Sequence, residues 1–266
     1  MKLQMYQVDA FASEVFKGNP AAVVPLDDWL PDKTLAAIAA ENNLSETAFF
    51  APLDGEEADY RLRWFTPTTE VELCGHATLA TMHTLVTHLG FQGERARFMT
   101  VSGAVAVDRD NDRYVLDFPS RPTEPIEPSE RITAALGKEP LELHAARGVL
   151  ALFDSAEAVR ALKPDLARIL ALETYAVIVT APGPSSDIDF VSRFFAPRAG
   201  VPEDPVTGSA HCTLTPFWAE RLGKDELHAF QVSVRGGELF CRMDKAANRV
   251  RIGGRAVTFF EGTINV

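Results

Sequence analysis

The sequence predicts an α+β fold built from two similar halves, each a curled, mostly antiparallel β-sheet around a central helix. The main observation is a repeat. An aromatic and proline segment followed by a glycine that opens a helix occurs at 64–67 with Gly75, and again at 194–197 with Gly208. A chain built this way is expected to fold as two pseudo-symmetric halves, with the two helix N-termini facing each other across the cleft between them.

The spacing of the glycines is kept along with the residue types. Gly75 and Gly103 are 28 residues apart, and so are Gly208 and Gly236. The segment 75–89 is small and apolar on nearly every helical face, and a helix that is hydrophobic all round is buried. Because strands are expected on both sides of this helix in the sequence, a sheet curled around it is the simplest arrangement.

The first half has clear strand and helix patterns separated by turn residues. Pro31 opens an amphipathic helix that ends near Asn43, and Gly18-Asn19-Pro20 is typical of a turn. The helix that begins at Gly75 runs to about Leu89. The expected strands of this half are 4–10, 21–24, 47–51 and 60–64.

The second half repeats the scheme, with Gly208 opening its central helix. Pro216 lies inside that helix, where it removes one backbone hydrogen bond and is expected to cause a kink. The expected strands are 173–180, 188–195, 228–234, 237–243, 247–252 and 255–264.

A division into domains 1–118 and 119–266 follows from the chain length and from a proline-rich stretch. The 266 residues suit two domains that each have their own core. Prolines recur with glutamates over 119–130, which is typical of a linker. The division leaves the last strand free to pair back with the first half.

Composition and charge exclude several classes of protein. Hydrophobic residues make up 46% of the chain and charged residues 24%, as in an ordinary soluble protein. The formal net charge of −11 argues against a nucleic-acid or anionic membrane partner. The three cysteines form no CxxC pair, and residues 1–5 begin no long apolar run. We therefore expect a reduced protein of the cytoplasm.

Glu46 is the first candidate for chemistry. It lies where a helix gives way to the apolar strand 47–51, and burial against apolar surface raises the pKa of a carboxyl group. A glutamate with a raised pKa suits general acid/base work near neutral pH. The alternative is a solvated glutamate in a turn, and the local sequence leaves both open.

Gly75 and His76 form the second candidate. A glycine at the start of a helix lets a ligand approach the backbone N–H groups, which attract an anion. His76 could donate a hydrogen bond or a proton to such a ligand. A core histidine bonded to a backbone carbonyl is the alternative, and spacing alone favours it.

The third candidate is the segment 203–209. Asp204 precedes a proline, which holds it in an extended conformation just before the second central helix, and Ser209 lies in the first turn of that helix after Gly208. A common turn with a helix cap would have the same sequence. The repeat favours a functional role, because this segment corresponds to the one that carries Gly75 and His76.

Motifs for metals, nucleotides and serine hydrolases do not occur. The histidines lack an HExxH or a Cys/His ligand spacing, so no metal site is expected. The sequence has no GxGxxG, Walker or GxSxG motif either. We therefore expect no cofactor.

At these residues the chain closely resembles the PhzF family, which is named for an isomerase of phenazine biosynthesis and shares the fold of diaminopimelate epimerase. Several of the shared motifs are specific, and they run from the first strand to the second central helix. They are Asp9-Ala10-Phe11, Gly18-Asn19-Pro20-Ala21, Leu44-Ser45-Glu46-Thr47-Ala48-Phe49, Phe65-Thr66-Pro67, Glu70-Val71, Leu73-Cys74-Gly75-His76-Ala77-Thr78 and residues 203–210.

The resemblance implies a cofactor-independent isomerase that binds a small anionic carboxylate substrate and works as a homodimer. The glutamate that matches Glu46 moves a proton between carbons of an unsaturated substrate. Residues that match His76 and Asp204 act beside it, and those that match Gly75, Gly208 and Ser209 bind or polarise the substrate.

The chain departs from its epimerase relatives at one position. Those relatives use two cysteines at the two helix N-termini, and here Cys74 occupies the first position but Thr207 the second. A two-thiol mechanism therefore lacks one partner. The alternatives to the isomerase are an amino-acid epimerase or racemase with one base or with mixed Glu and Cys groups, and a binding protein that carries out no reaction.

Overall fold

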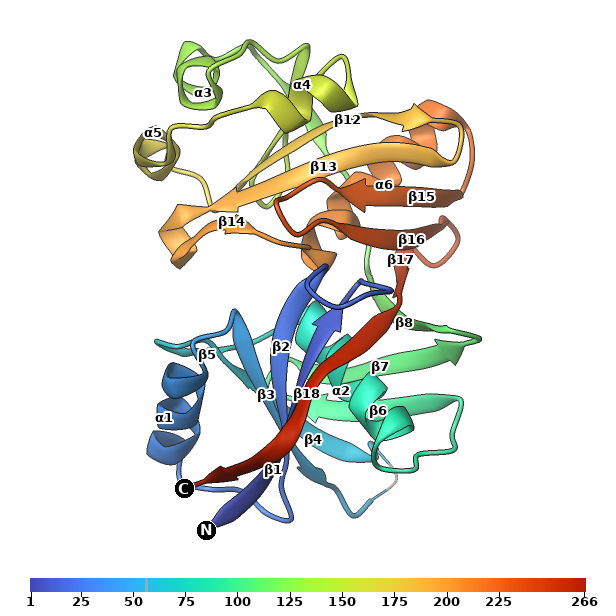
Figure 1. Cartoon of the computed structure of the whole chain (residues 1–266). Coiled ribbons are helices and arrows are strands. Elements are labelled where there is room, and N and C mark those ends of the chain that lie inside the picture. The colour runs from blue at the N-terminus through green and yellow to red at the C-terminus, as the bar shows by residue number, and fades with distance from the viewer. Residues whose placement is uncertain (56) are drawn as a thin grey trace. The chain divides into compact units, whose positions relative to one another are not determined.

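The computed structural model describes residues 1–55 and 57–266, which form two compact units. Unit 1 consists of residues 1–117 and 253–266, and unit 2 consists of residues 118–252. Strand β18 (Ala256–Asn265) pairs antiparallel with β1 (Lys2–Ala10), and Figure 1 shows the red and dark blue strands side by side. The segment 253–266 therefore lies in unit 1, and the sequence-based division had left the last strand free to pair back with the first half.

Unit 1 alternates hairpins with parallel crossovers. Besides β1 and β18, its elements are β2 (Asn19–Pro25), α1 (Asp32–Asn42), β3 (Glu46–Pro52), β4 (Tyr60–Phe65), β5 (Glu70–Val71), α2 (Gly75–Thr87), β6 (Arg95–Thr100), β7 (Gly103–Asp110) and β8 (Arg113–Pro119), whose last two residues belong to unit 2. Strands β1 and β2 are antiparallel, β2 and β3 are parallel across α1, β3 and β4 are antiparallel, and β4 and β6 are parallel across α2.

Unit 2 repeats this order of pairings. Its elements are β9 (Glu124–Ile126), α3 (Glu130–Leu136), β10 (Glu142–Ala145), β11 (Val149–Leu152), α4 (Ala156–Ala161), α5 (Leu166–Ala171), β12 (Val177–Ser185), β13 (Ile188–Ala196), η1 (Pro197–Ala199), β14 (Val201–Asp204), α6 (Gly208–Leu222), β15 (Glu226–Gln231), β16 (Gly237–Asp244) and β17 (Arg249–Gly254), whose last two residues belong to unit 1. Strands β10 and β11 are antiparallel, β11 and β12 parallel, β12 and β13 antiparallel, and β13 and β15 parallel across α6.

Helix α2 is the buried centre of unit 1. Residues 76–85 are all buried, and the helix contacts β1, β2, β3, β7 and β18. Three threonines of α2 lie in this core, and each hydroxyl donates a hydrogen bond to the backbone carbonyl four residues earlier. The hydrogen bonds run from Thr78 to Cys74 O at 2.6 Å, from Thr81 to Ala77 O at 2.8 Å and from Thr84 to Ala80 O at 3.0 Å.

Short elements of unit 2 are absent from the sequence-based prediction. The proline-rich stretch is not only a linker, since β9 within it pairs with β10. Helices α3, α4 and α5 have only six or seven residues, too few for a helical period to stand out. Side-chain caps at Ser129, Ser155 and Asp165 begin them. Their apolar residues pack against the core side of β12 and β13.

Helix length sets a limit on membrane insertion. Spanning a bilayer takes about 20 apolar residues. The longest helix in the described part of the chain, α6, has 15 residues, and no described helix is long and apolar enough to cross a membrane.

Candidate active site

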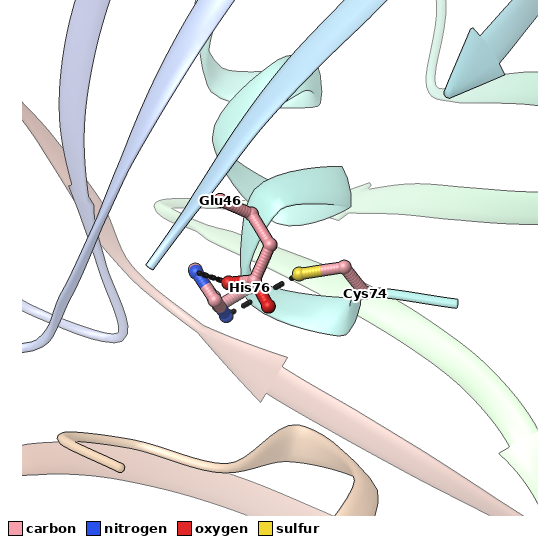
Figure 2. Close-up of side chains that lie close together, drawn as sticks. All are labelled: Glu46, Cys74 and His76. Atoms are coloured by element: carbon pink, nitrogen blue, oxygen red, sulfur yellow. Dashed lines mark hydrogen bonds and ion pairs between the residues drawn. The ribbon is translucent and has the colours of Figure 1, made fainter. Parts of the chain in front are cut away.

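Three side chains of unit 1 meet at the N-terminus of α2. Glu46 begins β3, Cys74 immediately precedes α2, and His76 lies in the first turn of that helix. The His76 ring contacts both of the others, with Nε2 3.1 Å from Glu46 Oε2 and Nδ1 3.5 Å from Cys74 Sγ (Figure 2). The structure thus brings Glu46, Gly75 and His76 together as one group, and it adds Cys74.

The backbone on either side places these groups. Helix α1 ends at Asn42, and the next residue, Asn43, caps it in a left-handed conformation with φ 49°, which directs the chain into β3. Strand β3 lies parallel to β2, with Glu46 opposite Ala21, and its next five residues are buried. Glu46 therefore stands at the end of a buried strand, and its side chain is only 16% exposed.

The ionisation of Glu46 differs from the prediction. Burial raises the pKa of this carboxyl group, but the positive charge of His76 and the polar contacts with His76 and Cys74 outweigh burial and lower the pKa below its ordinary value. The predicted raised pKa is wrong, because the sequence around Glu46 contains the apolar neighbours and not the cation. Glu46 is therefore ionised at neutral pH.

The ionisation of His76 complements that of Glu46. Burial lowers the pKa of this imidazole, but its polar contacts with Cys74 and Glu46 and the negative charge of Glu46 raise the pKa well above its ordinary value. Burial and the charge of Glu46 raise the pKa of the Cys74 thiol to about 11. Because that thiol is neutral at pH 7, Glu46 is the charge that keeps His76 protonated there.

The Glu46 and His76 contact is an ion pair and not an aligned hydrogen bond. Their nearest atoms are 3.1 Å apart, yet neither Nε2 nor Oε2 has a hydrogen-bond partner of good geometry among residues 1–55 and 57–266. Both atoms are buried. The two opposite charges therefore compensate each other inside the protein, where an unpaired charge would be costly.

The same three residues offer donor atoms of kinds that bind metal ions. One ligand atom from each of Glu46, Cys74 and His76 lies within 4.8 Å of the other two. Coordination by all three would require a deprotonated thiol and a neutral imidazole. The raised pKa values of Cys74 and His76 oppose both changes. That the protein needs no metal stays a prediction.

In unit 2 the predicted residues cluster at the N-terminus of α6. Asp204 ends β14, and Gly208 and Ser209 are the first two residues of α6. The Asp204 carboxylate accepts a hydrogen bond from Thr207 Oγ1 at 2.5 Å. That this group and the group around Glu46 bind one substrate stays a prediction.

Gln231 is a residue of this segment that the sequence analysis missed. It is fully buried at the end of β15 and hydrogen-bonds both Asp204 and Thr207. A signal for it exists in the sequence, since Leu227 and Ala229 alternate as the inward residues of β15 and Gln231 falls in the same register. An amide at an inward position predicts a buried polar contact.

Comparison with known proteins identifies the family. The model of the family described as "Phenazine biosynthesis-like protein" matches residues 8–262. The chain belongs to this family. An uncharacterized isomerase of Pseudomonas aeruginosa is 50% identical over 267 residues, with 100% of both chains covered. A crystal structure of a PhzF family protein from Enterococcus faecalis superposes with a TM-score of 0.95 at 46% identity, again over 100% of both chains.

The fold extends beyond the family. A hydroxyproline epimerase from Agrobacterium vitis has a TM-score of 0.61 at 12% identity, with 99% of this chain and 92% of that chain covered. At that identity the likeness concerns the fold alone. The predicted fold class, an α+β fold of the epimerase type with curled sheets and central helices, is confirmed.

Proposed function

We propose that this protein is a cofactor-independent isomerase that moves a proton between two carbons of a small, unsaturated carboxylate. Glu46 serves as the acid/base in this proposal, and His76 as the cationic partner. The observation that carries it is the buried ion pair of Glu46 and His76 at the N-terminus of α2. The name of the Pseudomonas aeruginosa relative, an isomerase, supports the same class of reaction.

The proposed reaction needs one base that also returns the proton. The Glu46 carboxylate takes a proton from an allylic carbon of the substrate, and the electron pair of that C–H bond forms a new double bond. The electron pair of the old double bond moves to the distal carbon, which takes the proton back from Glu46. Atoms and charge balance, and no oxidant, reductant or metal takes part.

His76 controls the strength of the base in this scheme. In the free protein its charge lowers the pKa of Glu46 and makes the carboxylate a weak base. A substrate carboxylate that also contacts the imidazolium would share this charge, so the pKa of Glu46 would rise on binding. The imidazolium also stabilises negative charge that develops on the substrate, and one such preorganised donor contributes about 3 kcal/mol.

The helix N-termini supply the proposed anion-binding groups. Gly75 begins α2 and Gly208 begins α6, and neither helix has a side-chain cap. Backbone N–H groups and the helix dipole favour an anion at such positions. We assign Gly75, Gly208 and Ser209 to substrate binding, and Asp204 to a contact with the reacting part of the substrate. A homodimer in the cytoplasm belongs to the same proposal.

A second candidate is an epimerase that uses a thiol. The 3.5 Å contact between Cys74 Sγ and His76 Nδ1 favours it, since imidazole could assist a thiol in proton transfer. Two observations weigh against it. The Cys74 thiol has a pKa of about 11, and the second position is Thr207, whose hydroxyl bonds the Asp204 carboxylate.

Deuterium incorporation separates these candidates. A panel of small unsaturated carboxylates and amino acids is incubated with the protein in deuterated water, and products are analysed by NMR and chiral chromatography. An isomerase shifts the double bond, and deuterium enters at the new C–H unless the proton returns faster than it exchanges. An epimerase inverts a stereocentre without moving a double bond. A binding protein is stabilised against thermal unfolding by its ligand and forms no product.

The variant that tests the base is Glu46→Gln, with Glu41→Gln as its matched control. The amide keeps the shape of the side chain and removes the base, so turnover is expected to fall at least about a thousandfold. Glu41 is exposed on α1, and its variant is expected to behave as the wild type. Near wild-type turnover by a folded Glu46→Gln protein would refute the proposal.

A further inference from the structure

The side-chain amide of Gln231 hydrogen-bonds both ends of the segment 204–207. Its Nε2 atom donates to the Asp204 carbonyl at 2.7 Å, and its Oε1 atom accepts from the Thr207 backbone N–H at 2.9 Å. The side chain is fully buried, so water does not compete for these bonds. Two backbone positions on either side of Pro205 are thereby held by one amide.

These contacts also fix which way the amide points. A backbone N–H can only donate and a carbonyl can only accept, so the oxygen of Gln231 must face Thr207 N and the nitrogen must face Asp204 O. The nitrogen also lies 3.2 Å from Thr207 Oγ1 and donates its second hydrogen there. The Thr207 hydroxyl is therefore an acceptor toward Gln231.

The direction of the next bond follows. A hydroxyl has one hydrogen, and with Gln231 donating to its oxygen, that hydrogen points to Asp204 Oδ2 at 2.5 Å. The carboxylate thus receives a hydrogen bond at the end of a one-way chain from Gln231 through Thr207. Hydrogen bonds to the charged form of a carboxyl group favour that form.

The Thr207 side chain bonds Asp204 and does not cap helix α6. Thr207 occupies the position before α6 where threonine usually caps the helix, but its side chain makes no capping bond. The hydroxyl turns to the carboxylate instead.

We propose that Thr207 and Gln231 are positioning residues that hold Asp204 ionised and orient it as a hydrogen-bond acceptor toward the substrate. The inference rests on the proposed contact between Asp204 and substrate. It also gives a role to Thr207, which occupies the position of the second catalytic cysteine in epimerase relatives. On this view Thr207 acts through Asp204 and exchanges no proton with the substrate.

The first test compares Thr207→Val with Thr207→Ser. Valine keeps the shape and removes the donor, whereas serine keeps the donor. In the deuterium assay, on the carboxylate that the wild type converts, kcat is expected to fall about tenfold or more in the valine variant and to stay within about threefold of wild type in the serine variant. Equal activity of both variants would overturn the inference.

The second test needs no substrate. The Asp204 carboxyl carbon is followed by NMR in ¹³C-labelled protein as pH is lowered, with Asp204→Asn used for assignment. The carboxylate is expected to take up its proton at higher pH in Thr207→Val and in Gln231→Leu than in wild type, while Thr207→Ser matches wild type. An unchanged titration in Thr207→Val, in protein with wild-type amide spectra, refutes the positioning role.

The two tests separate this inference from the proposed function. If Glu46→Gln remains active, the proposed base is wrong, and the NMR test still decides how Asp204 is held. If Glu46→Gln is inactive while Thr207→Val behaves as wild type in both tests, the isomerase proposal stands and the inference fails.

Discussion

At the scale of single residues, neighbours distant in sequence decide the chemistry of Glu46. The apolar residues nearby, Leu44 and 48–51, predict a raised pKa, yet the cation of His76, 30 residues further on, lowers it. The same pairing raises the pKa of His76. The sequence singled out both residues as candidates, but their charges follow from a contact that only the folded chain makes.

The coupling of this pair predicts the titration of His76. We expect its ring signals in NMR to titrate well above the ordinary histidine range in the wild type and at lower pH in Glu46→Gln, because the amide carries no charge. Equal midpoints in the two proteins would contradict the ion pair.

The same shifts predict how stability depends on pH. A raised His76 pKa contributes stability that is present below the unfolded pKa and lost as pH rises through the folded pKa. A lowered Glu46 pKa contributes stability that is present above the unfolded pKa and lost as pH falls through the folded pKa. Both contributions are fully present above the unfolded pKa of glutamate and below the unfolded pKa of histidine. The difference in unfolding free energy between wild type and Glu46→Gln, measured with urea, should therefore be largest in that pH range.

The structure argues against an acid/base role for the Cys74 thiol. Because its thiol has a pKa of about 11, it is protonated at neutral pH and is no base in the free protein. Cys74→Ala is expected to retain turnover to within about a hundredfold, or roughly 2.7 kcal/mol of transition-state stabilisation. Cys74→Ser serves as the isosteric control, and a larger loss in both variants would point to a thiol acid/base.

At the scale of elements, local sequence predicts the longer ones well. The all-round apolar character of 75–89 predicts a buried helix, and α2 is buried over residues 76–85. Gly18 lies in the bend that the sequence predicts, but Asn19 and Pro20, which were assigned to the same turn, are the first residues of β2 and pair with β1. The short elements of unit 2, such as β9 and helices α3 to α5, were missed because their pairing and packing partners, not their own periodicity, define them.

Gly18 is the turn position where a side chain is least tolerable. Its φ is +63°, and a Cβ atom there would lie 2.1 Å from the carbonyl oxygen of Ala10. Gly90 has a similar φ of +71° with nothing within 4 Å of a Cβ atom. Gly90→Ala is expected to cost about 1 kcal/mol of unfolding free energy, and Gly18→Ala at least about 2 kcal/mol more. Equal costs in denaturant melts would contradict the close approach.

At the scale of the whole molecule, the chain is organised by duplication and by the return of its last strand. Both units place a central helix between two parallel strands, β4 and β6 in unit 1 and β13 and β15 in unit 2. Strand β18 then pairs with β1 along nearly its whole length. Unit 1 therefore needs residues from both ends of the sequence.

This topology predicts the effect of truncation. Removing residues 256–266 deletes β18 and exposes an edge of β1, so the shortened protein is expected to be insoluble or to lose the folded signals of unit 1. Removing Val266 alone leaves the paired residues of β18 and is expected to have little effect. A soluble truncated protein with an intact unit 1 spectrum would contradict the pairing.

The sequence by itself determined the family, the duplicated α+β architecture and the residues that carry the proposed chemistry. The family, the architecture and these residues follow from local patterns, because turn glycines, apolar periodicity and motifs such as 74–78 can be recognised without knowledge of the fold. Only the tertiary structure decided the ionisation of Glu46, the contact of Cys74 with His76 and the chain from Gln231 to Asp204. Each depends on side chains between 2 and 30 positions apart meeting in a particular orientation, and a pKa or a hydrogen-bond direction is set by the geometry of that meeting.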